Sequence, residues 1–347
     1  MKKLISLLTA LVLVTVMLAA CGTKPAETPD PDTKPVAPAP ASDNVKTGLY
    51  AMTNFDGSAD AGAEDGIAKT ASTIVAVTVD SEGKIDNIAI DQLQSEIKFD
   101  AKGKITTDMA TELVSKNDRG ADYGMKKASS IGKEWNEQIA AFSAYCKGKT
   151  LDEIKGIAYD ESGKPSDADL ASSVTLTVNY FTYAIEGAVK NAKDMGAMKG
   201  DKLGLAISGN IEKSKDASAD EPGVAQAYST FTAVTTGSDG KITSCIIDGL
   251  QANVNFDATG KITSDLKAAP KTKNELGKEY GLAKASSIGK EWNEQAAAFA
   301  EYVTGKTAEE VKGIAMDDSA KAKDADLLAS VTVSIGGFVQ LVEKAAK

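Results

Sequence analysis

Two threonines, Thr175 and Thr332, stand in matching surroundings and are the first candidates for chemistry. Each lies six residues after an acidic side chain, Asp169 or Asp326, and each precedes an apolar pattern with helical spacing. The chain contains no histidine, so Ser-His-Asp and Cys-His hydrolysis, ordinary zinc sites and His-ligated haem all lack their central group. It also has no Cys-x-x-Cys motif, which leaves thiol redox chemistry and iron–sulfur clusters unsupported. We therefore expect the protein to bring in a cofactor or to bind a partner.

The segments that must position these threonines occur twice in the chain. KKASSIGKEWNEQ at residues 126–138 recurs as AKASSIGKEWNEQ at 283–295, and FDAKGKIT recurs as FDATGKIT. The members of each pair, like the two threonines, are 157 residues apart. This constant spacing predicts two homologous globular domains, at residues 47–197 and 198–347, rather than a solenoid.

Each copy carries the same order of local patterns. Residues 70–94 are two alternating runs around a glycine turn, which predicts a β-hairpin, and residues 96–106 predict a second strand–turn–strand unit. Apolar positions with helical spacing predict helices at 131–148 and 180–193, with a shorter helix at 150–157. Hairpins followed by helices predict an α+β fold, in which antiparallel β-hairpins pack against helices in each domain.

The N-terminal residues have the pattern of a secretory signal, because MKK is basic and a short apolar run follows it. We predict a signal peptide at residues 1–20. LAAC, which ends at Cys21, looks like a bacterial lipobox and implies cleavage before Cys21 and lipidation of its thiol; the alternative is an ordinary signal peptide with a chance cysteine. Residues 21–46 hold six of the nine prolines and predict an extended tether. A lipid anchor at the outer face of the cell membrane is therefore expected.

The net charge argues against two kinds of binding partner, and the positions of the two remaining cysteines argue against a disulfide. The formal net charge is −10, and it becomes −12 once Lys2 and Lys3 leave with the signal peptide. The negative charge of the mature chain argues against binding to nucleic acid. It also argues against adhesion to anionic lipid by any means except the anchor. Cys146 and Cys245 stand at different places in the two repeats, which favours buried free thiols over a disulfide.

The stretch DLASSVTLTVNYFTYAIEGAV, from Asp169, resembles the attachment motif of the FMN-binding domain family. That family includes the flavin-carrying C subunit of the sodium-pumping NADH:quinone reductase, and two-domain lipoproteins that Gram-positive bacteria use for extracellular electron transfer. Its motif is an Asp, two variable residues, Ser or Thr, Gly, Ala, and then the Thr or Ser that carries FMN. A helix rich in Ala and Val follows. The layout of lipobox, tether and two domains is similar to that of the lipoproteins.

Matched residue by residue, the motif falls on both copies of the repeat. In the first copy the Asp is Asp169, the small positions are Ser172, Ser173 and Val174, and the acceptor is Thr175. In the second copy the Asp is Asp326, the small positions are Ala329, Ser330 and Val331, and the acceptor is Thr332. Both copies depart from the motif, since Ser replaces Gly and Val replaces Ala.

A shifted alignment remains open. It starts from Asp167 and Asp324 and makes Ser173 and Ser330 the acceptors. The helix that follows aligns with the family only when the threonines take the acceptor place, so we favour the threonines.

The ASSIGKEWNEQ segment matches between the copies as closely as the threonine sites do. One interpretation is that it closes over a flavin ring, which Trp135 and Trp292 would shield. Nearby serines would then hydrogen-bond the flavin or its phosphate, namely Ser129, Ser130, Ser286 and Ser287. The other interpretation, which the apolar stripe of the helix favours, is that the tryptophans pack in the core and that Ser130 caps the helix.

The resemblance implies that a flavin transferase joins FMN to Thr175 and to Thr332 as a phosphoester. It implies a membrane-anchored electron carrier rather than a stand-alone enzyme. Electrons would arrive from a membrane NADH or quinol dehydrogenase and leave to ferric iron, a soluble flavin or an extracellular reductase. A carrier of this kind needs no general acid or base. Two rivals stay open: a cell-surface lipoprotein that binds a ligand without a redox cofactor, and a structural or signalling lipoprotein.

Overall fold

Three long strands build the first sheet of the computed structural model, which describes residues 43–347. They are β1 (Asn44–Asn54), β2 (Gly66–Val79) and β3 (Ile85–Phe99), and they pair antiparallel. The short β5 (Lys193–Met198) adds to β1, so that the order is β3-β2-β1-β5. Val, Ile and Thr dominate β2, and these β-branched residues suit a pleated strand with packed faces.

The second repeat builds an equivalent sheet with one strand borrowed from the first. Its own strands are β6 (Lys202–Asn210), β7 (Gly223–Thr236) and β8 (Ile242–Phe256). The two-residue β4 (Glu112–Leu113) of the first repeat pairs with the end of β6, which gives the order β4-β6-β7-β8. A segment of one repeat therefore completes the sheet of the other.

Helices follow the strands in each repeat, and several begin at a capping box. The first repeat contains α1 (Lys116–Arg119), η1 (Gly120–Tyr123), η2 (Met125–Lys127), α2 (Trp135–Cys146), α3 (Leu151–Lys155), α4 (Ala168–Ala171) and α5 (Asn179–Asn191). The second contains α6 (Lys273–Leu276), η3 (Gly277–Tyr280), η4 (Leu282–Lys284), α7 (Trp292–Val303), α8 (Ala308–Lys312), α9 (Ala325–Leu328) and α10 (Gly336–Ala346).

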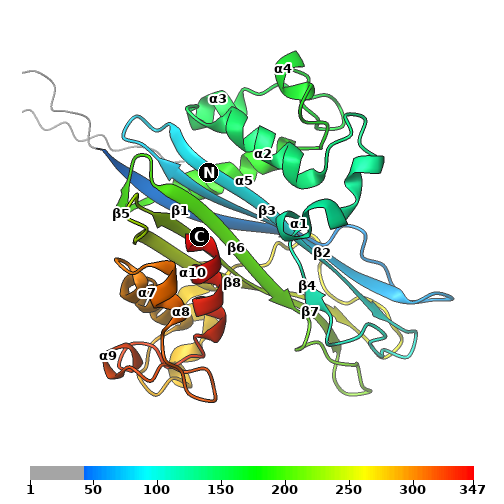
Figure 1. Ribbon diagram of the computed structural model, residues 1–347. Helices are drawn as coiled ribbons and strands as arrows, with labels where there is room; N and C mark the ends of the chain where they lie inside the picture. Colours follow the sequence, from blue (N-terminus) through cyan, green and yellow to red (C-terminus); the bar gives the residue numbers. More distant parts are fainter. Residues whose placement is uncertain (1–42) are drawn as a thin grey trace, which may run out of the picture. The chain divides into compact units, whose positions relative to one another are not determined.

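The two sheets pack against each other, and the helices cover their outer faces (Figure 1). Along β2, Ile74 and Ala76 contribute to the core between the sheets, whereas Val75 and Val77 pack beneath α2 and α5. This division follows from the two-residue period of a strand, which sends successive side chains to opposite faces. The described residues are thus arranged as helices, sheet, sheet and helices, and both repeats share the central core.

Equivalent residues of the two repeats meet across this core. The rings of Phe99 and Phe256 stack with their centroids 4.2 Å apart. Two further contacts are reciprocal: the Ile262 N–H donates to Asp60 Oδ1 at 2.7 Å, and the Ile105 N–H donates to Asp216 Oδ1 at 2.8 Å. The repeats therefore face each other about an approximate twofold axis, and the described residues belong to one compact unit.

The α+β prediction is confirmed, with antiparallel sheets and packed helices in both repeats. The hairpin at 70–94 is confirmed as β2 and β3, and the predicted helices are α2, α3 and α5 with shorter bounds. The unit at 96–106 is smaller than predicted, because only an isolated bridge joins Phe99 to Ile105.

Both cysteines of the described part are buried free thiols, as predicted. The signal peptide, Cys21 and the tether up to residue 42 lie outside the described residues, and the last three tether positions belong to β1. No helix within 43–347 is both long and apolar enough to span a membrane.

Candidate functional site

Thr175 lies in a short loop that two buried valines anchor. The loop leaves α4, whose N-terminus is capped by Asp167 through bonds of 3.1 Å from the Asp169 and Leu170 N–H groups, and it ends where α5 begins. Val174 and Val178 are buried. Thr175 lies between them in the sequence and is half-buried, so it stays near the surface while the two valines pack in the core.

A buried glutamine fixes the threonine. The Oε1 atom of Gln138, a fully buried residue of α2, accepts from the Thr175 N–H at 2.8 Å and from its hydroxyl at 3.2 Å. The amide nitrogen of Gln138 donates to Ser129 Oγ at 3.1 Å and to the Lys133 carbonyl at 3.2 Å. One side chain thus ties the threonine loop to the segment before α2. An amide is suited to this place because it carries an acceptor and two donors.

The second repeat reproduces the arrangement. Gln295 Oε1 accepts from the Thr332 N–H at 2.8 Å, from its hydroxyl at 3.2 Å and from the Val333 N–H at 3.1 Å. Its amide nitrogen donates to Ser286 Oγ at 3.2 Å and to the Lys290 carbonyl at 3.1 Å. The threonine and the first serine of each ASSIGKEWNEQ segment, both named from the sequence, are therefore brought together.

The other predicted residues of the first motif lie at the surface or bond within the loop. Asp169 is exposed, and the exposed Ser172 donates its hydroxyl to the Asp169 carbonyl at 2.7 Å. Ser173, the alternative acceptor, donates to the Leu170 carbonyl at 3.2 Å. Ser130 is exposed and does not cap α2, whose N-cap is Glu134.

The second motif is arranged in the same way. Asp326 and Ser287 are exposed, and Ser330 donates its hydroxyl to the Leu327 carbonyl at 3.1 Å.

The tryptophans are core residues in both repeats. Trp135 is 3% exposed and packs edge-on to Phe181, and Trp292 is 5% exposed and packs edge-on to Phe338. Of the two interpretations offered by the sequence, this placement agrees with packing.

A buried charged cluster near each tryptophan was missed from the sequence. Lys116 places its Nζ 5.1 Å from the Trp135 ring centroid and 4.7 Å from that of Tyr123. Burial lowers the pKa of Lys116 to about 8, although the charge of Asp91 opposes this shift. Burial also raises the pKa of Asp91 to about 6, against hydrogen bonds from Ser115 and from the Asn117 and Gln92 N–H groups.

The second repeat has an equivalent cluster. Burial raises the pKa of Asp248 to about 6, and Lys273 Nζ lies 4.6 Å from the Trp292 ring centroid. The signal that would have found these residues is the repeat itself. Asp91, Lys116, Asn117 and Gln138 all recur at the 157-residue spacing.

The arrangement fits an ester on the threonine hydroxyl in part. Thr175 is half-buried, and Gln138 would retain the Thr175 N–H after the hydroxyl hydrogen is lost. The start of α5 offers little support for a phosphate, because the Val178 and Asn179 N–H groups both donate to the Gly163 carbonyl. The loop therefore suits attachment at the hydroxyl without relying on the end of the helix.

Comparison with known proteins finds one partial relative of this chain. No family model matches the chain, and no solved structure matches it. A protein named chlorophenol reductase, from Desulfitobacterium hafniense, is 37% identical over 75 residues, which are 18% of this chain and 23% of the relative. The chain thus spans less than a quarter of the relative's length, and this likeness does not place the chain in a family.

Proposed function

We propose that this chain is an electron carrier anchored at the outer face of the cell membrane, with FMN joined to Thr175 and Thr332 as phosphoesters. The observation that carries the proposal is the duplicated threonine site. In each repeat the hydroxyl of a half-buried threonine is held by the same buried glutamine, beside the same serine. Two matched hydroxyl sites in a chain without histidine favour a carried cofactor over acid–base catalysis.

The roles of the chain's own residues follow from their contacts. Thr175 would supply the ester oxygen, Gln138 would hold the loop through the threonine N–H, and Ser129 would hold Gln138. The flavin would supply one- and two-electron chemistry, whose potential the surrounding protein tunes. The partial relative is named a reductase, and a redox role for this chain agrees with that name.

The partners follow from the same proposal. A flavin transferase would load the two hydroxyls. A membrane NADH or quinol dehydrogenase would be the donor, and ferric iron, a soluble flavin or an extracellular reductase would be the acceptor.

The test is the intact mass of the chain made together with a flavin transferase. We expect two added FMN groups, each less one water. Thr175→Ala and Thr332→Ala should each remove one group, whereas Thr177→Ala, a matched neighbour whose hydroxyl donates to the Ser162 carbonyl, should remove none.

Two outcomes would change the proposal. Loss of a group in Ser173→Ala but not in Thr175→Ala would move the ester to the serine. Native protein from the producing strain with neither repeat modified would end it.

A further inference from the structure

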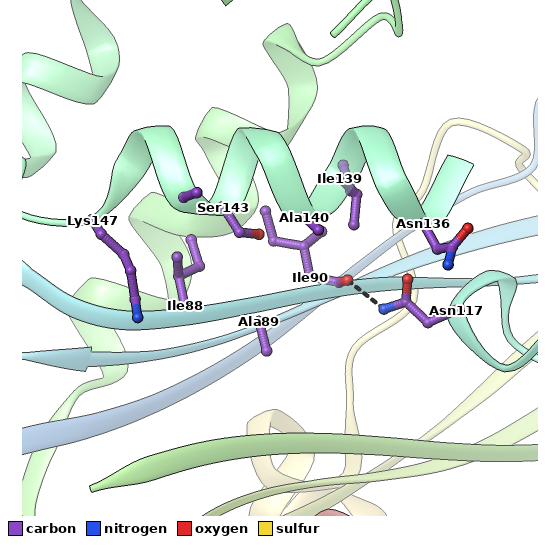
Figure 2. A pocket seen from close by; sticks show the side chains of 10 residues that line it. Ile88, Ala89, Ile90, Asn117, Asn136, Ile139, Ala140, Ser143 and Lys147 are labelled. Atoms are coloured by element: carbon purple, nitrogen blue, oxygen red, sulfur yellow. Dashed lines mark hydrogen bonds between the residues drawn. The ribbon is translucent and has the colours of Figure 1, made fainter. Parts of the chain in front are cut away.

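Grooves lie at equivalent places in the two repeats. In the first repeat a groove of about 470 Å³ runs between α2 and β3. Figure 2 shows Asn117 and Asn136 at one end of this groove, Lys147 at the other, and Ile88 and Ile90 along the strand. All of its lining residues belong to the first repeat.

The equivalent groove of the second repeat is a larger cavity of about 880 Å³. It lies between α7 and β8, and residues of the first repeat form a further wall, including Tyr50 on β1 with Lys193 and Met195 on β5. The extra wall explains the greater volume. A volume of this size is within the usual range for pockets that bind small molecules.

The wall from the second repeat carries hydrogen-bond acceptors. Asn293 Oδ1 is buried and has no hydrogen-bond partner among the described residues. The equivalent Asn136 Oδ1 is unpaired as well, but its groove lacks the wall from the other repeat. Buried polar atoms are nearly always paired, so an unpaired carbonyl in the lining of a cavity points to a donor from outside the chain. Glu301 lies one helical turn beyond Ala297 on α7, and its exposed side chain forms no ion pair or hydrogen bond with other described residues.

The wall from the first repeat carries donors. Lys193 makes no ion pair among residues 43–347, so its ammonium group is free to donate. Burial and the charge of Glu275 raise the pKa of Tyr50, so its phenol stays protonated and can donate as well. The cavity thus has acceptors on α7 and donors on β1 and β5, and the carboxyl groups of Asp248 and Glu275 also line it.

The rest of the lining is mixed: Asp248, Thr272, Asn274 and Glu275 are among its polar residues, and other side chains are apolar. Leu49 and Met195 lie on one side, and Ile247, Ala297 and Ala300 lie on the other. The small alanine side chains let a flat ring approach the helix closely.

We propose that this cavity binds a small planar heterocycle with N–H donors on one edge and carbonyl or ring-nitrogen acceptors on another. The N–H edge meets Asn293 and Glu301, and the acceptor edge meets Lys193 and Tyr50. This site is separate from the proposed flavin esters and does not depend on them. Gln295, which holds Thr332, and Asn293, which lines the cavity, are both on α7.

The probe is lumichrome, an uncharged fluorescent three-ring compound with two ring N–H groups and two carbonyls. Its binding is measured by fluorescence anisotropy on the full chain carrying Thr175→Ala and Thr332→Ala, so that no ester flavin contributes. We expect saturable binding. 1,3-Dimethyl-lumichrome, which lacks both N–H donors, should bind at least tenfold more weakly.

Substitutions locate the site. Asn293→Ala and Lys193→Ala should each weaken lumichrome binding about tenfold, and Ala297→Phe should abolish it by filling the cavity. Asn136→Ala and Lys147→Ala change the corresponding groove of the first repeat and should leave binding unchanged. Far-ultraviolet circular dichroism of each variant establishes that it is folded.

Several results would overturn the inference. These are the absence of saturable binding, equal binding of the dimethyl compound, or equal loss in the Asn136→Ala and Asn293→Ala variants. Because the probed chain has no ester site, none of these results bears on the proposed flavin attachment.

Discussion

Gly163 lies so close to the side chain of Asn179 in the first repeat that there is little room for a Cβ atom. A Cβ on Gly163 would lie 2.5 Å from the side-chain carbonyl carbon and oxygen of Asn179. In the second repeat the glycine of this contact stands at the other of the two positions. Ala320 takes the turn position, and Gly336 takes the start of the helix, where its own Cβ would be 3.1 Å from that of Ala320. In each repeat one member of the pair is glycine, and a second side chain would make the contact tighter than usual.

Gly163→Ala should therefore destabilise the protein by about 1–3 kcal/mol, through the clash with Asn179 and through the positive φ of 74° at the turn. Asn179→Gly in the same chain should restore part of this loss, since it removes the clash but leaves the φ strain. Urea unfolding of the two single variants and the double variant measures the coupling. A double variant no more stable than Gly163→Ala would refute the contact.

Ala320→Gly is the matched change in the second repeat. Ala320 is the non-glycine residue of the described chain with a positive φ, of 56°. Relief of this strain should offset the added freedom of the unfolded chain, so that the variant is as stable as the parent or up to about 1 kcal/mol more stable. A clear loss of stability would show that the methyl group of Ala320 contributes packing that outweighs its backbone strain.

Gln138→Ala and Gln295→Ala should each destabilise the chain by about 1–3 kcal/mol, because buried donors and acceptors lose their partner. Their effect on flavin loading should be larger at the threonine of the same repeat than at the other. The intact mass of the protein after a limited reaction time with the transferase measures this difference. Asn136→Ala, on the same helix, is the control. Equal loading of both threonines in the Gln138→Ala variant would mean that the glutamine does not position its loop.

We predict that the protein loses stability as the pH rises, because the carboxyl groups of Asp91 and Asp248 are buried. Burial raises the pKa of each carboxyl to about 6, above the ordinary value of 3.8. The folded state therefore binds these protons more tightly than the unfolded state. The resulting stabilisation is complete below about pH 4 and is lost as the pH rises through 6, at about 3 kcal/mol for each group.

The variant Asp91→Asn isolates one of these contributions. Its side-chain oxygen can still accept from the Gln92 and Asn117 N–H groups. The free energy of unfolding of the variant, minus that of the parent, should rise between pH 4 and pH 7 in urea titrations. Exposed carboxylates are common to both chains and cancel in this difference. Parallel curves for the two proteins would contradict the buried, proton-binding state of Asp91.

Phe256→Ala should destabilise both repeats together by about 3–5 kcal/mol, because it leaves a cavity in the core that they share. Hydrogen exchange should speed up in β2 as well as in β7. Leu328→Ala, at a residue that is 40% exposed, serves as the control and should change neither strand. Faster exchange in β7 alone would indicate that the repeats unfold independently.

The sequence predicted those features that local pattern controls. Alternation along residues 70–94 indicated β2 and β3, and the 157-residue spacing revealed the duplication. It did not reveal how the copies meet. The pairing of β4 with β6 and the stack of Phe99 on Phe256 join residues that are distant in sequence, and no local pattern encodes such contacts.

The candidate site was predicted to a similar degree. The threonines and Ser129 were found from motif and repetition, but Gln138 looked like one more polar residue on a helix. Its role depends on burial, which became visible only when α2 and the loop before α5 were placed together. Asp91 and Lys116 were missed for the same reason, since charged residues are normally expected at the surface.

The approximate twofold relation between the repeats makes this chain the covalent equivalent of a homodimer. In a true homodimer, every substitution appears on both sides of the axis. In this chain one half can change alone. An example is Glu301 of the second repeat, which stands where the first repeat has Ala144. Fusion of the two halves therefore lets a symmetric scaffold evolve unlike sites, so that one face can take on a new ligand while the other keeps its original form.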